Sequence, residues 1–98
     1  MERVDVELPA EGELTVVDVG GERVAVARLD GVVHAFDDAC THAQCSLSGG
    51  EVEDGAVVCP CHQGRFDLRS GAVLGGPPQV PLRIWQARVV DGGLELGT

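Results

Sequence analysis

Four glycine-containing dipeptides divide the chain at regular places and limit the folds that it can adopt. They are Gly20-Gly21, Asp30-Gly31, Asp54-Gly55 and Asp91-Gly92, and each lies between short runs rich in Val and Leu. A two-residue hairpin turn of type I′ needs a positive φ at both central residues, which Gly, Asn and Asp tolerate best. The pattern therefore predicts antiparallel β-hairpins rather than helices.

The runs between these turns are the predicted strands of an all-β fold. They cover residues 14–19, 23–29, 32–36, 57–59, 84–90 and 94–96, and they are too short and too β-branched for helices. The second run contains RVAVAR, whose alternation puts Val24 and Val26 on one face. The first run, LTVVDV, is apolar on both sides, which predicts either a bulge or burial of both faces.

Composition narrows the classes of function. A chain of 98 residues makes one domain. Seven arginines, no lysine and a formal charge of -9 disfavour nucleic acid and anionic membranes as partners. The N-terminus carries charges where a signal peptide needs an apolar run, and no window approaches the 18 apolar residues of a membrane span. These features predict a soluble, cytoplasmic protein.

Residues 37–67 differ from the flanking segments because the apolar alternation stops, and they hold all four cysteines and two of the three histidines. One cluster is Cys40-Thr41-His42, and the other is Cys59-Pro60-Cys61-His62. Each cluster can donate one sulfur and one nitrogen, a ligand set that suits tetrahedral zinc or a 2Fe-2S centre with mixed ligation. Zinc fingers usually keep their cysteines together and their histidines together, so zinc is the second interpretation.

The motif C-x-H, followed after sixteen residues by C-x-x-H, resembles the signature of Rieske iron-sulfur proteins. The stretch GRFDLRSGAVLGGPPQVPL also resembles the segment after the second cluster in that family, so the resemblance spans roughly residues 32–90. It implies a Rieske-like antiparallel β-sandwich in a single domain, residues 1–98. Residues 1–36 and 68–98 would form the base, with residues 37–67 inserted as a cluster-binding loop subdomain.

Carried over to this sequence, the resemblance implies a Rieske-type 2Fe-2S cluster with Cys40 and Cys59 on the inner iron. His42 and His62 would hold the outer iron and face solvent. In the cytochrome bc-type branch of the family, cysteines at the positions of Cys45 and Cys61 form a disulfide, and we expect the same bond here. The alternative is two buried thiols, which a cytoplasmic location favours.

Two other positions point to a different branch. Gly64 and Phe66 stand where the bc branch has a Ser and a Tyr that bind the cluster sulfurs, and His62, Gly64 and Phe66 resemble the ferredoxins that serve Rieske-type oxygenases. Without those hydroxyls, the reduction potential should lie near the bottom of the roughly -150 to +300 mV Rieske range.

This resemblance implies a one-electron carrier, not an enzyme. The carrier would pass electrons from a flavin-dependent or other ferredoxin reductase to a terminal oxygenase or similar acceptor. The alternatives are a small Rieske subunit of a larger redox complex and, less favoured, a structural zinc module. A bc-complex subunit is disfavoured because a membrane span is missing.

The remaining polar and aromatic residues receive weaker assignments. His34 is expected to be a satisfied or surface residue, and Trp85 and Phe36 are expected to fill the core. Arg65 and Arg69 are expected to pair with nearby acids or to meet an acidic partner. Five acidic residues form either a rim that steers a basic partner or a solvated surface: Asp37, Asp38, Glu51, Glu53 and Asp54.

Overall fold

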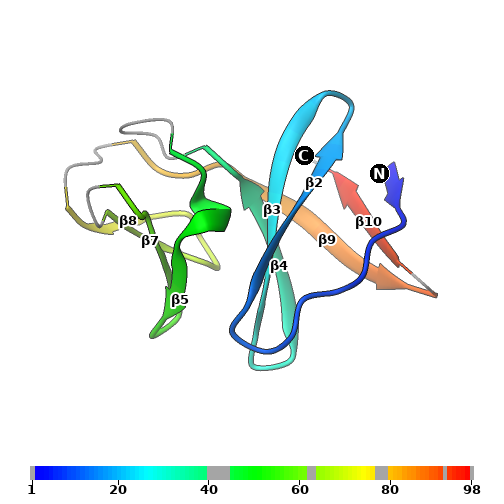
Figure 1. The fold of residues 1–98 in the computed structure, drawn as a ribbon, viewed down its shortest axis with the longest axis horizontal. Helices are drawn as coiled ribbons and strands as arrows, with labels where there is room; N and C mark the ends of the chain where they lie inside the picture. Colours follow the sequence, from blue (N-terminus) through cyan, green and yellow to red (C-terminus); the bar gives the residue numbers. More distant parts are fainter. Residues whose placement is uncertain (1, 40–44, 62–63, 77–79, 92, 98) are drawn as a thin grey trace.

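The computed structural model describes residues 2–39, 45–61, 64–76, 80–91 and 93–97. In these residues the chain forms ten strands and one short 3-10 helix (Figure 1). None of the described helical residues makes a segment long and apolar enough to cross a membrane. The elements are β1 Glu2–Val4, β2 Leu14–Val19, β3 Glu22–Leu29, β4 Val32–Asp37, η1 Leu47–Gly49, β5 Glu51–Glu53, β6 Ala56–Val58, β7 Arg65–Asp67, β8 Val73–Gly75, β9 Ile84–Val90 and β10 Gly93–Gly97.

The larger sheet has the strand order β1-β10-β9-β4-β3-β2, and its neighbours are antiparallel. Two of the predicted turns connect hairpins of this sheet, whereas the predicted turn at Asp91-Gly92 includes Gly92, which lies outside the described residues. Gly20 and Gly21 have φ values of 58° and 87°, and Asp30 and Gly31 have values of 53° and 76°, which is the left-handed pair that a type I′ turn requires. β2 pairs with β3 residue for residue from Leu14 to Val19, so the apolar run LTVVDV forms a regular strand.

The smaller sheet has the order β5-β6-β7-β8 and is also antiparallel. The predicted turn at Asp54-Gly55, with φ values of 50° and 78°, joins β5 to β6. β6 ends at Val58, one residue earlier than expected, and Cys59 follows it. The three-residue strands β5, β7 and β8 were not predicted, because runs this short beside charged residues carry no clear apolar alternation.

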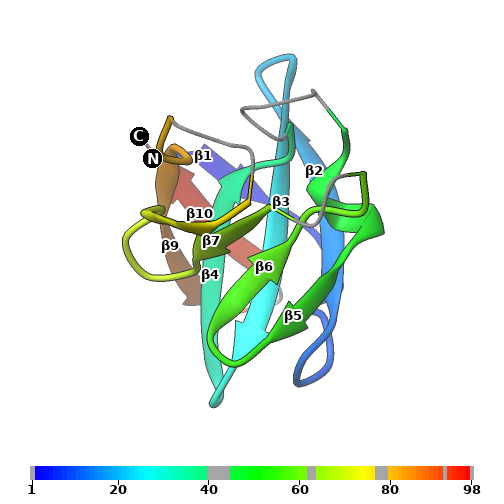
Figure 2. The ribbon, with the colours of Figure 1, turned by 90° about the vertical axis from the view of Figure 1, so that its left-hand side faces the viewer.

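The described core has two parts that meet at β3. Val24 and Val26 face the hollow of the curled larger sheet, where Trp85, Leu94 and Leu96 also lie. Ala25 and Ala27 point the other way, toward the core under the smaller sheet. Figure 2 shows the strands of the smaller sheet in front of β3 and β4. Because β3 is covered on both faces, all four residues are fully buried, and the smaller sheet has a rigid support.

Phe36 and Trp85 take the structural places that the sequence predicted. Phe36 is fully buried between β4 and the smaller sheet, and Trp85 is 5% exposed in the hollow of the larger sheet. Phe36 pairs with Ile84 across β4 and β9, and Ala35 pairs with Trp85. These contacts join the segment before the first Cys/His cluster to the segment after the proline-rich loop.

Candidate metal centre

Of the four predicted cluster ligands, Cys59 lies among the described residues, and Cys40, His42 and His62 lie outside them. Cys59 directly follows β6 and is 1% exposed. Its backbone N–H donates a hydrogen bond to the carbonyl of Gly64 over 2.8 Å. A backbone hydrogen bond therefore closes the base of the second Cys/His segment, which contains Cys59 and His62. Cys59 is buried against the core that holds Phe66 and Leu47.

The first Cys/His segment, which contains Cys40 and His42, is also closed at its base. Ala39 and Ser46 form an antiparallel bridge, and the N–H of Leu47 donates to the carbonyl of Asp38 over 2.6 Å. The Asp38 side chain is 2% exposed and accepts a hydrogen bond from the N–H of Ser48 over 2.8 Å. Residues on both sides of positions 40–44 are thus held in fixed positions.

Asp38 is a structural residue that the sequence analysis placed in an acidic rim. Its carboxylate lies 3.4 Å from Nε of Arg23, and its backbone N–H donates to the carbonyl of Arg23. A carboxylate so deeply buried must be paired or hydrogen-bonded, because desolvation of an ionised group is costly. The signal in the sequence was a pair of acids directly after an apolar strand, at Asp37 and Asp38.

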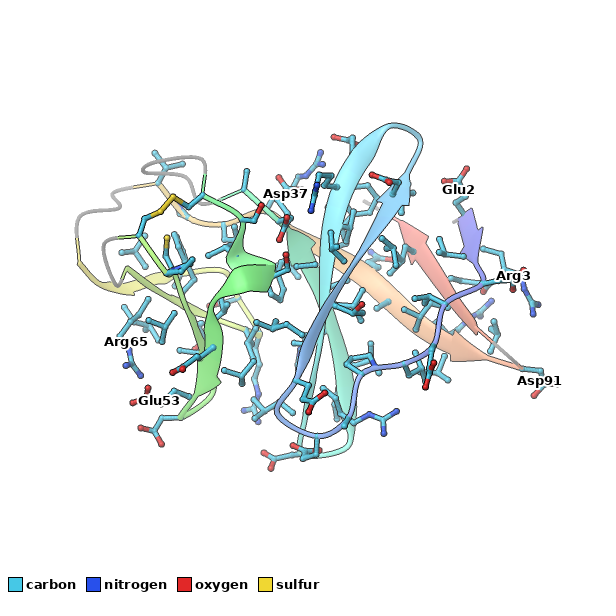
Figure 3. All side chains as sticks on the ribbon, in the orientation of Figure 1. Glu2, Arg3, Asp37, Glu53, Arg65 and Asp91 are labelled. Carbon is cyan, nitrogen blue, oxygen red and sulfur yellow. A yellow bond between two sulfur atoms is a disulfide. The ribbon has the colours of Figure 1, made fainter. Side chains whose placement is uncertain are left out.

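A disulfide between Cys45 and Cys61 joins the two segments, with the Cα atoms 6.4 Å apart (Figure 3). Cys45 is half-buried, and Cys61 is exposed. The expected bond is present in the structure. It joins residues 16 apart in the sequence, and closing such a loop contributes about 3 kcal/mol in the chain-entropy model. The two Cys/His segments are therefore joined covalently.

Close backbone packing supports the second segment from one side. A Cβ atom on Gly50 would overlap the carbonyl oxygen of Val58, the residue before Cys59. Gly50 therefore allows the chain after η1 to lie against the end of β6. Beside this contact is an open hollow of about 440 Å³, lined in part by Gly49, Cys59 and Arg65.

The other acidic residues of the expected rim fall into two groups. Asp37 accepts hydrogen bonds from Arg83 and Trp85. Glu51, Glu53 and Asp54 are exposed on the hairpin of β5 and β6, and Figure 3 shows Glu53 next to Arg65. Nη1 of Arg65 lies 3.7 Å from Oε1 of Glu53, so the expected pairing of Arg65 with a nearby acid is confirmed. Of the five acidic residues predicted to steer a partner, the three on this hairpin are the exposed ones.

His34 lies half-buried on β4, opposite Ala27 of β3. Burial lowers its pKa from the ordinary value of 6.5, and the positive charge of Arg69 lowers it further, whereas Asp67 raises it. The sequence analysis assigned no ligand role to His34. Its electrostatic interactions with Asp67 and Arg69 indicate that it lies near the end of β7.

The chemistry of the donors fits an iron-sulfur cluster. The thiol of Cys59 is buried at the end of a rigid strand, next to a disulfide that holds the other Cys/His segment in place. A buried thiolate beside imidazole donors suits a 2Fe-2S centre with mixed sulfur and nitrogen ligation. Cys45 and Cys61 form the disulfide, which is compatible with the prediction that Cys40 and Cys59 supply the sulfur ligands.

Comparisons with known proteins identify the family. The family model described as "Rieske [2Fe-2S] domain" matches residues 3–86. The chain belongs to the Rieske family. The match begins at residue 3, well before the Cys/His clusters. The sequence motifs alone indicated a resemblance that begins near residue 32. The Rieske base therefore includes the N-terminal strands. The cofactor of this Rieske protein is a 2Fe-2S cluster.

Relatives within the family are ferredoxins of dioxygenase systems. The anthranilate 1,2-dioxygenase ferredoxin subunit of Burkholderia cepacia is 43% identical over 77 residues, which is 79% of this chain and 71% of that protein. The ferredoxin of carbazole 1,9a-dioxygenase from Nocardioides aromaticivorans IC177 has a TM-score of 0.90 at 30% identity, over 99% of this chain and 98% of that one.

A third comparison involves a complex. A chain in the structure described as "Complex of reduced oxygenase and oxidized ferredoxin in carbazole 1,9a-dioxygenase" is 31% identical, with a TM-score of 0.84. The similarity covers 91% of this chain and 92% of that one. The Rieske fold predicted from the sequence is confirmed by these neighbours.

Proposed function

We propose that this protein is a Rieske-type ferredoxin that passes one electron at a time from a reductase to a terminal oxygenase. The observation that carries the proposal is the similarity to the Nocardioides ferredoxin, which extends over nearly the whole of both chains. The sequence relative from Burkholderia cepacia is also a ferredoxin subunit. The protein is an electron-transfer component of an oxidoreductase system and not itself a catalyst.

We further propose that Cys40, Cys59, His42 and His62 hold the cluster. When bound, the cluster supplies a site that takes up and releases one electron, and neutral imidazole ligands raise its potential relative to an all-cysteine centre. The chain supplies the setting. Cys59 lies on the buried side against the core, and the disulfide holds the two segments together.

The partners follow from the same similarity. One structural neighbour is a ferredoxin in complex with an oxygenase, and we propose a terminal oxygenase as acceptor and a flavin-dependent or other ferredoxin reductase as donor. A formal charge of -9 disfavours nucleic acid and anionic membrane surfaces. Exposed acids on the hairpin of β5 and β6 favour association with basic surfaces at low salt.

We propose a cytoplasmic location and one domain over residues 1–98, with residues 1–36 and 68–98 as the base and residues 37–67 as the cluster-binding subdomain. Within this division the base segment lends one strand to the smaller sheet, because β8, Val73–Gly75, pairs with β7. The smaller sheet therefore also fixes where the chain re-enters the base.

The test is the reduction potential of the purified holoprotein, measured by voltammetry across pH with an EPR spectrum of the reduced protein. We expect a Rieske-type spectrum and a wave near about -150 mV that falls at alkaline pH. A wave above about +100 mV would contradict the oxygenase-ferredoxin assignment. A colourless protein with bound metal but no wave would instead support the structural zinc module.

Two histidine variants test the ligand set. His62→Cys replaces a neutral ligand by a thiolate, so we expect a lower potential and a weaker pH dependence, because His42 is then the one imidazole ligand that can still titrate. His34→Gln removes a histidine outside the proposed ligand set and should leave both properties unchanged. If His62→Cys retains the wild-type potential and pH response, the ligand assignment is wrong. Persistent co-purification with a larger oxidoreductase would favour the redox-complex subunit.

A further inference from the structure

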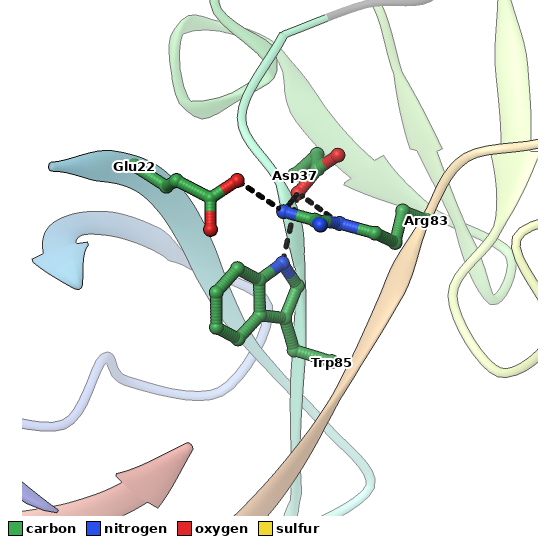
Figure 4. Close-up of polar contacts among 4 residues, drawn as sticks. All are labelled: Glu22, Asp37, Arg83 and Trp85. Carbon is green, nitrogen blue, oxygen red and sulfur yellow. Dashed lines mark hydrogen bonds and ion pairs between the residues drawn. The ribbon is translucent and has the colours of Figure 1, made fainter. Parts of the chain in front are cut away.

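Four side chains from three strands and one loop end form a polar network at the end of β4 (Figure 4). Nη2 of Arg83 lies 2.7 Å from Oε1 of Glu22 and 3.0 Å from Oδ1 of Asp37. Nε of Arg83 donates to the same oxygen of Asp37 over 3.0 Å. The indole N–H of Trp85 also donates to it over 2.8 Å. One carboxylate oxygen of Asp37 thus accepts two hydrogen bonds and also pairs with Nη2 of Arg83.

The network connects two segments that are far apart in the sequence. Asp37 is the last residue of β4, three residues before Cys40. Arg83 directly precedes β9, at the end of the proline-containing loop. The backbone N–H of Asp37 also donates to the carbonyl of Arg83 over 3.1 Å. Asp37 is therefore held to the loop end by both its main chain and its side chain.

The next residue along the chain, Asp38, links this network to the far end of the first Cys/His segment. Asp38 is buried, and its side chain accepts a hydrogen bond from the N–H of Ser48. Its carbonyl accepts a second hydrogen bond from the N–H of Leu47. Because Asp37 and Asp38 are adjacent, a displacement of Asp37 would pass directly to both ends of the segment.

We propose that Arg83 is a positioning residue for the cluster. It acts through Asp37 on the segment that carries Cys40 and His42, because that segment starts three residues after the carboxylate that Arg83 holds. The inference rests on the proposed ligand set, since it assumes that this segment holds the iron.

An isolated surface ion pair contributes little to stability, and the Arg83 side chain is 43% exposed. Two features set this one apart. The guanidinium bridges two carboxylates with a planar array of donors, which lysine lacks. It also lies 4.8 Å from the centre of the Trp85 ring, a distance that favours a cation–π contact. The core position of Trp85 therefore orients Arg83.

Removal of Arg83 has two expected effects on the cluster. Asp37 loses the hydrogen bond and the ion pair that Arg83 supplies, so the base of the first segment loosens. In addition, the carboxylates of Glu22 and Asp37 lose the cation between them, and uncompensated negative charge near a redox centre opposes the uptake of an electron. Both the geometry and the potential of the cluster should change.

The experiment compares Arg83→Gln with Arg88→Gln in the holoprotein. Arg88 is the matched control. It lies on β9, five residues after Arg83, and pairs with Glu95 of β10. Its side chain is also more exposed than that of Arg83. We expect Arg83→Gln to lower the reduction potential at low salt and to broaden the EPR lines of the reduced cluster. Arg88→Gln should retain the wild-type potential and line widths. Equal values for both variants and the wild type would overturn the inference.

Two further variants keep the test decisive if Arg83→Gln does not load a cluster. Trp85→Phe removes the indole donor to Asp37 but keeps an aromatic ring, so it should broaden the EPR lines. Glu22→Gln keeps the contact between Arg83 and Asp37 and removes one negative charge, so it should raise the potential. Absence of both effects would refute the role of the network. A wild-type protein without a Rieske spectrum would instead refute the proposed function.

Discussion

Replacement of Asp38 by Ala should destabilise the protein more than any other single change of an acidic residue before the first Cys/His segment. The carboxylate is 2% exposed and accepts a hydrogen bond from the N–H of Ser48. Truncation leaves that N–H without an acceptor, which costs about 1–3 kcal/mol. It also removes the ion pair with Arg23, whose side chain is 59% exposed, so this second contribution is below about 1 kcal/mol.

The two contributions add to about 1–4 kcal/mol, and each kcal/mol lowers the apparent melting temperature of a domain of this size by about 4–8 °C. Asp38→Asn is the matched variant, because its amide oxygen still accepts from Ser48 and only the charge is lost. We expect it to lower the melting temperature by about 4–8 °C, or roughly 1 kcal/mol. The assay is thermal unfolding of the holoprotein, followed by circular dichroism and by the visible absorbance of the cluster.

Two results would refute the reasoning. If Asp38→Asn melts as early as Asp38→Ala, the hydrogen bond from Ser48 is not the main contribution. If Asp38→Ala melts within about 3 °C of the wild type, the buried carboxylate does not hold the base of the first segment. Arg23→Gln provides an internal check, since loss of the exposed partner alone should have a smaller effect than loss of the buried acid.

Two other expectations come from the packing. Gly50→Ala should lower the melting temperature and speed cluster loss, because its Cβ would overlap the carbonyl of Val58. Gly75→Ala has open space around its Cβ and should be neutral. Equal stability of the two variants in thermal unfolding would contradict this prediction. The pKa of His34 is lowered on folding. The unfolded chain therefore binds more protons than the folded protein near and below pH 6.5. For this reason the contribution of His34 to the free energy of unfolding rises as pH increases through that range. An NMR titration should give His34 a midpoint below 6.5, and Arg69→Gln should raise that midpoint; a fall would contradict the assigned cause.

The sequence predicted those parts of the fold that depend on local chemistry. Asp30-Gly31 and Asp54-Gly55 have the positive φ values of type I′ turns, and this conformation follows from the residues themselves. The strands of the larger sheet are long enough to show their pattern. β7, Arg65–Asp67, was missed because its burial depends on Phe66 packing under the smaller sheet, a tertiary contact that three residues cannot reveal.

The candidate site was predictable to the same degree. The motif CTH…CPCH and its resemblance to Rieske proteins predicted the family and the bond between Cys45 and Cys61, both of which are confirmed. The roles of Asp37 and Asp38 were not predictable, because an acidic pair in a sequence reads equally as a solvated surface. Only the arrangement of β4 against β9 and η1 shows that one acid is buried and that the other binds Arg83.

The two Cys/His segments are held by different kinds of interaction. The second follows β6, whose Val57 is fully buried against the core that contains Ala25 and Ala27 of β3, so apolar packing fixes Cys59. The first is held at Asp37 and Asp38 by hydrogen bonds and ion pairs. Salt weakens exposed ion pairs and leaves apolar packing intact or strengthens it. Ionic strength therefore acts on the first segment rather than on the second, and the disulfide limits how far the two can separate when it does.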